Sequence, residues 1–160
     1  MNAASPVAPK EQKAFIVHAD EGERINAFGS EAIFKLTGEN TGGTFTLCLG
    51  VVPPGGGPPP HVHRLDDEIF IIVEGRYNFL IGDTWTEVGP GAVVYLPRGN
   101  AHTFRNIGAT PSRHWAFLNP SGFETFYLRC AEVFAAPGPP DFARLGAISH
   151  EHGYDIIRGG

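Results

Sequence analysis

The sequence predicts an all-β domain followed by a short C-terminal helical extension. Its 160 residues include 21 glycines and 14 prolines, which separate short apolar segments. That pattern favours many short strands joined by turns. In the last forty residues, the apolar positions change to a helical spacing. We therefore expect a mobile tail over residues 1–12, a β-barrel domain over 13–119 and a helical extension packed on it over 120–160.

Turn residues divide the central part of the chain into its expected strands. Turns are expected at 39–43 and 82–83, and the Gly/Pro-rich segment 53–60 is expected to form a rigid connector that presents His61. Between these turns, the apolar segments are the expected strands, at 14–18, 32–36, 44–52, 68–73, 76–81, 92–96, 102–107 and 115–118.

The strand at 68–73 is apolar on both faces. Successive side chains of a strand alternate, so Glu68 should point inward together with Phe70 and Ile72. The other face carries Ile69, Ile71 and Val73, where a solvated sheet would carry polar residues. A partner sheet, a docked helix or a second subunit must cover this face, and from it we expect a homodimer.

In two further strands, the alternation of residues predicts aromatic side chains that point inward. Tyr77, Phe79 and Ile81 alternate with more polar neighbours and are expected to point inward. His102 and Phe104 share a face of the strand at 102–107.

The C-terminal extension is expected to hold two helices. Ser121 and Glu124 have the spacing of a capping box, and an apolar stripe follows as far as residue 134. Prolines at 137–140 should end this helix. A second helix is expected at 141–152, with Gly153 as its stop, before a short extended end at 154–157. These helices could cap the barrel or form a gate over its pocket.

Composition excludes several classes of partner. The formal net charge is -5, and the 12 lysines and arginines form no cluster, so we expect no nucleic acid and no anionic membrane as partner. The longest strongly apolar segment, 69–73, is far too short to span a bilayer. The N-terminal residues lack the pattern of a secretory signal, and Cys48 and Cys130 are expected to be reduced and packed. A cytoplasmic location is therefore expected.

Four residues have the pattern of metal ligands. His61 and His63 are two positions apart, so both project from one side of an extended strand. Glu68 and His102 complete a set of nitrogen and oxygen donors suited to one divalent transition metal, which could be Fe, Ni, Mn, Co, Cu or Zn. Glu68 follows His63 by an odd number of residues, so a straight strand would place the two side chains on opposite faces. Residues 64–67 must therefore turn the chain so that the carboxylate faces the histidines. Ordinary, non-ligand roles are expected for His18, His114, His150 and His152.

Two sequence blocks carry a resemblance to a known family. The first runs from Gly55 to Gly75 and matches G-x5-H-x-H-x4-E-x6-G, and the second runs from Gly91 to Asn106 and matches G-x5-P-x-G-x2-H-x3-N. In these blocks the chain resembles the cupin family, and specifically small bacterial single-domain cupins. The resemblance implies a double-stranded β-helix, or jelly-roll barrel, with a metal at its mouth held by His61, His63, Glu68 and His102. The segment 120–126 and the late helix add a likeness to cupins grouped with quercetin dioxygenases.

This resemblance implies a metal-dependent dioxygenase, an oxidoreductase that acts on an enolic or phenolic small molecule. Glu68 is the expected catalytic residue, as a general base for the substrate hydroxyl, and Phe70 and Phe104 are the expected substrate contacts near the metal. Asp66 and Asp67 are expected in a solvated turn. A non-catalytic cupin that binds a small ligand and a metal-dependent isomerase or lyase remain alternatives, because one fold hosts many functions.

Overall fold

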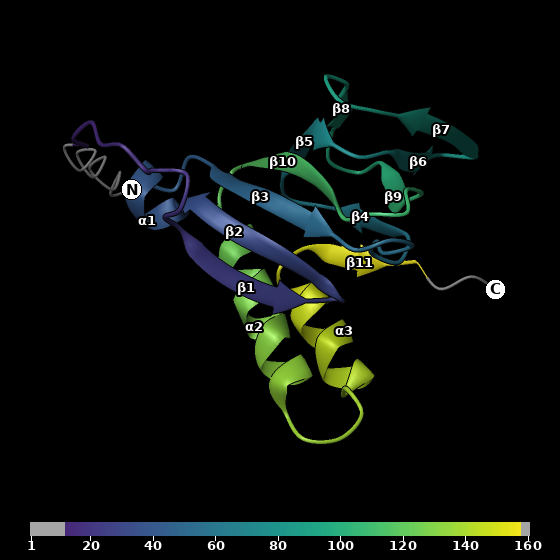
Figure 1. Cartoon of the computed structure of the whole chain (residues 1–160). Helices are drawn as coiled ribbons and strands as arrows, with labels where there is room; N and C mark the ends of the chain where they lie inside the picture. The colour runs from purple at the N-terminus through teal and green to yellow at the C-terminus, as the bar shows by residue number, and fades with distance from the viewer. Residues whose placement is uncertain (1–11, 158–160) are drawn as a thin grey trace, which may run out of the picture.

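The computed structural model describes residues 12–157, which form two antiparallel sheets and a pair of helices (Figure 1). The expected tail at 1–12 therefore lies outside the described residues, apart from Gln12. In the larger sheet the strand order is β1-β2-β3-β10-β5-β8. Its members are β1 (Glu23–Ala27), β2 (Ser30–Leu36), β3 (Thr46–Val52), β10 (Ser112–Asn119), β5 (Asp67–Glu74) and β8 (Val93–Leu96).

The smaller sheet has the order β11-β4-β9-β6-β7. It consists of β11 (Tyr154–Ile156), β4 (His61–His63), β9 (Ala101–Asn106), β6 (Tyr77–Ile81) and β7 (Thr84–Val88). The expected turn at Gly82-Asp83 joins β6 and β7 as a two-residue hairpin, and Gly82 has a positive φ of 59°, as such turns require.

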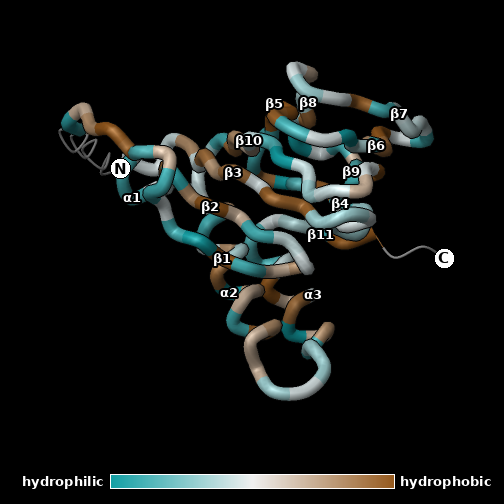
Figure 2. The backbone as a smooth tube through the Cα atoms, in the orientation of Figure 1, coloured by the Kyte–Doolittle hydropathy of each residue, from teal (hydrophilic) through white to brown (hydrophobic). Residues whose placement is uncertain are grey.

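The core lies between the two sheets. Alternate residues of β5, β6 and β10 point into it, and Ile72, Tyr77, Phe79 and Leu118 are at most 2% exposed. Figure 2 shows hydrophobic segments along β3 and β5 of the larger sheet. Cys48 and Cys130 are free and buried, as expected. The all-β, double-stranded β-helix architecture with short C-terminal helices is thus confirmed.

Two helices from the C-terminal part lie side by side at the β1 and β11 end of the sheets (Figure 1). They are α2 (Phe123–Ala135) and α3 (Phe142–Glu151). The carboxylate of Asp141 caps α3 by accepting the Arg144 N–H at 3.0 Å, and Gly153 follows that helix with φ 84°. Among the described residues, no helix has both the length and the apolar character needed to cross a bilayer.

Three expectations about strands were wrong. The segment 14–18 forms no strand, and Phe15 and Ile16 are 52% and 78% exposed; β1, not this segment, is the edge strand beside β2. Strands β1 and β7 were not expected, because each carries few apolar residues. Ile81 is 41% exposed rather than inward, since it ends β6 beside the hairpin turn.

Two expectations about turns also need correction. Residues 38–41 form a short helix, α1 (Gly38–Thr41), instead of a simple turn. The expected capping box at Ser121 is absent: Gly122 is the N-cap of α2 and makes no side-chain cap. Glu124 instead accepts hydrogen bonds from the backbone N–H of Gly38, that of Gly122 and the Thr46 hydroxyl.

Candidate metal centre

The fold brings the four expected metal ligands together between the two sheets. His61 and His63 come from β4, and His102 comes from β9, where it pairs across the ladder with His61. Glu68 comes from β5 in the opposite sheet. One ligand atom from each of the four residues lies within 4.8 Å of the others. His63, Glu68 and His102 are all at most 4% exposed.

The turn between His63 and Glu68 transfers the chain from one sheet to the other. It leaves β4 at Arg64, whose N–H donates to the carbonyl of Gly153 at 2.8 Å, and enters β5 at Asp67. The odd spacing between the two ligands therefore places them on facing inner surfaces, as the sequence required.

Each histidine ring is oriented by a hydrogen bond at Nδ1. The Nδ1 of His61 lies 2.8 Å from the Pro59 carbonyl, and that of His102 lies 3.0 Å from the Asn100 carbonyl. The Nδ1 of His63 lies 3.0 Å from Asp66 Oδ2. Because these oxygen partners only accept, each Nδ1 carries a proton, which leaves Nε2 as the nitrogen that can bind a metal. Metal-binding histidines in proteins are held in this way.

The Nε2 atoms converge on the Glu68 carboxylate. The Nε2 of His63 lies 3.6 Å from Glu68 Oε2, and that of His102 lies 3.3 Å from it. The Nε2 atoms of His61 and His63 are 3.0 Å apart. Glu68 Oε2 and His102 Nε2 are buried and have no hydrogen-bond partner among residues 12–157. A cation among these atoms would satisfy both of them, so the donor set fits a divalent metal.

Burial and the neighbouring charges shift the pKa values of the cluster. Burial and the adjacent imidazoles lower the pKa of His61 to about 3, which keeps its ring neutral and able to bind a metal. Burial acts to raise the pKa of Glu68, but His63 and His102 outweigh it and lower that pKa below its usual value. The carboxylate is therefore ionised at neutral pH, as a metal ligand or a base must be.

Asp66 does not lie in a solvated turn, which corrects the expectation for this residue. It is 4% exposed, and its Oδ2 contacts both the His63 ring and the Tyr154 hydroxyl, the latter at 3.3 Å. Asp67, by contrast, is half-exposed and pairs with the Arg98 guanidinium at 2.9 Å. No sequence pattern distinguishes these two aspartates, because the partner of Asp66, Tyr154, comes from β11, 88 residues away in the chain.

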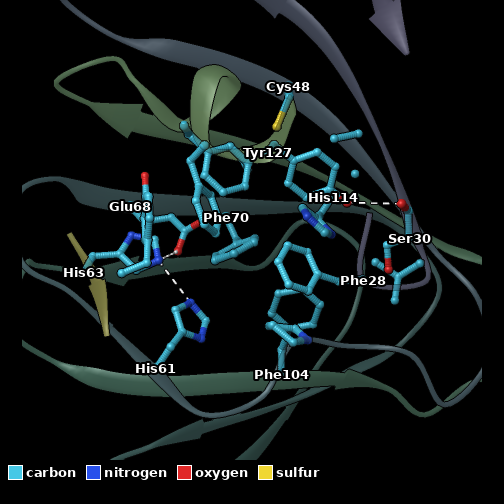
Figure 3. Close-up of a pocket in the computed structure, with 18 of the residues that line it drawn as sticks. Phe28, Ser30, Cys48, His61, His63, Glu68, Phe70, Phe104, His114 and Tyr127 are labelled. Carbon is cyan, nitrogen blue, oxygen red and sulfur yellow. Dashed lines mark hydrogen bonds and ion pairs between the residues drawn. The ribbon is translucent and has the colours of Figure 1, made fainter. Parts of the chain in front are cut away.

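A cavity of about 120 Å³ adjoins the cluster (Figure 3). His61, His63 and Glu68 line it, and so do both expected substrate contacts, Phe70 and Phe104, whose ring centroids are 5.3 Å apart. Side chains of the C-terminal segment close one side, namely Phe123, Phe126, Tyr127, Ser149, Tyr154 and Ile156. The helices thus form part of the cavity wall.

His114 is a cavity residue that the sequence reasoning missed. It is 5% exposed and lines the cavity, and its Nδ1 lies 2.9 Å from the Tyr77 hydroxyl. A usable signal was its inward position on β10, since His114 alternates with Ala116 and Leu118, both of which are buried. No motif marks it, because its environment is built by strands distant in sequence.

Comparison with known proteins agrees with this architecture. The family model described as "Cupin domain" matches residues 48–117, which contain all four clustered residues. An uncharacterised protein of Streptomyces coelicolor is 33% identical over 95 residues, which cover 59% of this chain and 85% of that protein. Quercetin 2,3-dioxygenase of Bacillus subtilis is 28% identical over 98 residues, which cover 61% of this chain but only 29% of that enzyme.

A solved structure shows the same fold. The crystal structure of a predicted oxalate decarboxylase from Thermotoga maritima aligns with a TM-score of 0.60 and 24% identity, covering 66% of this chain and 99% of that one. A two-sheet barrel with three histidines and one glutamate gathered inside it defines a class of small β-barrel proteins with a candidate metal site. The chain belongs to the cupin family.

Proposed function

We propose that this cupin is a metal-dependent dioxygenase that acts on an enolic or phenolic small molecule. The observation that carries the proposal is the juxtaposition of the His61, His63, Glu68 and His102 cluster with a small aromatic-lined cavity. The similarity to quercetin 2,3-dioxygenase of Bacillus subtilis supports the reaction class.

In this proposal, His61, His63, Glu68 and His102 hold one divalent transition metal. When bound, such a metal supplies Lewis acidity that stabilises an enolate or phenolate and brings the redox chemistry that a dioxygenase needs. The fixed Nδ1 hydrogen bonds of the three histidines keep the donor atoms aimed at one point. The protein therefore supplies a preorganised site and does not have to assemble it around the ion.

Glu68 has a second task in the proposal, as general base for the substrate hydroxyl. Its carboxylate is buried at the cavity wall, and its Oε2 has no hydrogen-bond partner among the described residues. An ionised carboxylate in that position can accept a proton from a hydroxyl bound in the cavity. Removal of that proton gives the electron-rich anion that reacts with dioxygen.

The cavity favours an apolar, planar substrate. Phe70 and Phe104 form an edge-to-face pair beside the cluster, and such rings exclude water and pack on flat molecules. No lysine or arginine is present among the described residues that line the cavity. This lining disfavours a phosphorylated sugar and favours a neutral phenol or enol.

The Glu68→Gln variant tests the proposal. We expect it to keep measurable metal and to lose about 10²–10⁴-fold in oxygen uptake, because an amide oxygen can still bind a metal but cannot take the hydroxyl proton in the same way. Metal content by elemental analysis and oxygen uptake with single-ring enols and phenols are measured on the same samples. Glu74→Gln, an exposed change at the end of the same strand, is the matched control.

A metal-loaded Glu68→Gln variant with wild-type oxygen uptake would remove the general-base role. If the wild-type protein shows no uptake across enols, diketones, phenols and flavonols, the dioxygenase proposal fails. A non-catalytic ligand-binding cupin would then be the better description.

We further propose that two copies of the chain form a homodimer. Support comes from the outward face of the larger sheet, where Ile71 and Val73 are 42% and 45% exposed and neither helix covers them. The second copy would bury this apolar surface.

A further inference from the structure

His114 lies at the end of the cavity away from the metal cluster. In the ladder between β5 and β10, Glu68 pairs with Leu118, Phe70 with Ala116 and Ile72 with His114. His114 is therefore two inward positions from Glu68, or ~13 Å along the strand at about 3.3 Å per residue. Figure 3 shows Glu68 and His114 on opposite sides of Phe70.

Small residues leave room for the His114 ring. Gly50 is its cross-strand partner on β3, and a Cβ atom at Gly50 would lie 2.3 Å from His114 Nε2. Ala116 and Cys48 continue this small-residue strip along the cavity wall. A side chain larger than hydrogen at residue 50 would displace the imidazole.

The two nitrogens of His114 have different surroundings. Nδ1 meets the Tyr77 hydroxyl, and Tyr77 is fully buried and does not line the cavity. Nε2 is next to Gly50, which does line it. Among the described residues, Nε2 has no protein partner, so it is the nitrogen available to a molecule in the cavity.

The proton on this ring can be assigned from Tyr77. The Tyr77 hydroxyl has no acceptor other than His114 among the described residues, and a buried hydroxyl without an acceptor is costly. Tyr77 therefore donates to Nδ1, and the ring proton lies on Nε2. Burial lowers the pKa of His114 to about 4 and raises that of Tyr77 well above its usual value. At neutral pH the imidazole is therefore uncharged and the Tyr77 hydroxyl keeps its proton.

We propose that the Nε2–H of His114 binds a second oxygen of the substrate, at the end opposite the metal cluster. The ligand is then a single-ring phenol or enol with chelating oxygens at one end and an acceptor oxygen, such as a carbonyl, at the other. A cavity of about 120 Å³ limits the ligand to a single ring, since a cavity of roughly 150 Å³ holds one benzene. This inference rests on the proposed function for the chelated end of the ligand.

A tautomer measurement tests the first part without metal or ligand. Long-range ¹H–¹⁵N NMR of the metal-free wild-type protein should show His114 protonated at Nε2 and unprotonated at Nδ1. The opposite tautomer, or a charged ring at neutral pH, would overturn the proposal.

A binding cycle tests the second part. Zn²⁺-loaded protein, which has no redox chemistry of its own, is titrated calorimetrically with 3,4-dihydroxybenzaldehyde and with 4-methylcatechol. In the wild type, the aldehyde oxygen should reach His114. In His114→Phe, the preference for the aldehyde over the methyl compound should fall by about 2- to 12-fold, the value of one hydrogen bond. Because both ligands are measured in both proteins, any difference in affinity between the ligands that does not involve His114 cancels.

His18→Phe is the matched control, because His18 is exposed and lies outside the cavity lining; its preference should equal that of the wild type. If His114→Phe does not fold, His114→Gln replaces it, and its amide N–H should keep part of the preference. An unchanged preference in a folded, Zn²⁺-loaded His114→Phe variant overturns the proposal. If neither catechol binds the loaded wild type, the proposed function fails as well, and the ligand role of His114 fails with it.

Discussion

Asp66 is the residue through which a distant strand reaches the candidate metal centre. Its Oδ2 accepts from the His63 ring at 3.0 Å and from the Tyr154 hydroxyl at 3.3 Å. The Tyr154 ring also packs edge-on against His63, with centroids 4.6 Å apart. The carboxylate therefore fixes the proton of His63 on Nδ1, while Tyr154 fixes the carboxylate.

We expect Asp66→Asn to weaken metal binding by roughly 10- to 100-fold, the usual effect of removing such a partner. The amide can still accept from Nδ1, but it lacks the negative charge that makes the imidazole a stronger donor to a metal. Competition with a chromophoric chelator for Zn²⁺ measures the change. Asp67→Asn, beside it but paired with Arg98, should leave affinity close to that of the wild type, and equal losses in both variants would contradict the role of Asp66.

At the scale of single residues, the four clustered side chains could be found from sequence because their spacing is local and fixed by two blocks. Asp66 carried no such signal, and His114 only its alternation with the buried Ala116 and Leu118 on β10. Each is buried by segments far away in the chain, Tyr154 in one case and Gly50 with Tyr77 in the other. Their residue types alone describe a solvated turn and an ordinary histidine equally well.

At the scale of elements, Glu124 attaches α2 to the larger sheet. Its carboxylate accepts the Gly38 N–H at 2.8 Å, the Gly122 N–H at 3.1 Å and the Thr46 hydroxyl. Thr46 is fully buried. One side chain thus joins the start of α2 to α1 and to the first residue of β3, and so positions the helix that forms one side of the cavity.

Glu124→Ala should lower the free energy of unfolding by about 1–3 kcal/mol, because the substitution leaves the buried Thr46 hydroxyl and the Gly38 N–H without their acceptor. The Gly122 N–H keeps only its 3.3 Å contact with the Thr46 hydroxyl oxygen. Urea denaturation followed by circular dichroism measures the loss. Glu132→Ala, at an exposed position of the same helix, controls for the change in helix composition. Its free energy of unfolding should be within about 0.5 kcal/mol of that of the wild type. A Glu124→Ala variant as stable as Glu132→Ala would show that the attachment contributes nothing.

Elements with strong alternation or a helical stripe were predictable, including β5, β6 and both long helices. The failures have a common cause, which is that strand formation depends on a partner. Residues 14–18 are apolar enough for a strand but pair with no strand in the part of the chain that the structure describes. By contrast, β1 and β7 are polar and form because β2 and β6 offer an open edge. The apolar content of a segment alone does not indicate which sheet edge is free to pair with it.

At the scale of the whole molecule, the larger sheet has an apolar outer surface. Cross-strand neighbours continue it from β10 to β8: Trp115 pairs with Ile71, and Ile71 pairs with Val93. Val93 and Tyr95 are 64% and 59% exposed. The helices dock at the other end of the barrel, against β1 and β11, so they do not cover this surface, and an apolar patch of this kind is typical of a protein interface.

We expect the chain to sediment at twice its 17.2 kDa mass, as a symmetric dimer through this surface. Val93→Glu would place two charges in the interface and should convert the dimer to a monomer, without a loss of helix and sheet signal in circular dichroism, because Val93 is mostly exposed within one chain. Leu128→Glu, at a 43% exposed position of α2, makes the same substitution away from the sheet and should leave the dimer intact. Sedimentation equilibrium over a wide concentration range decides the matter: a wild-type monomer at the highest concentration, or a dimer that Val93→Glu does not weaken, would mean that the outer face of the larger sheet is not the interface.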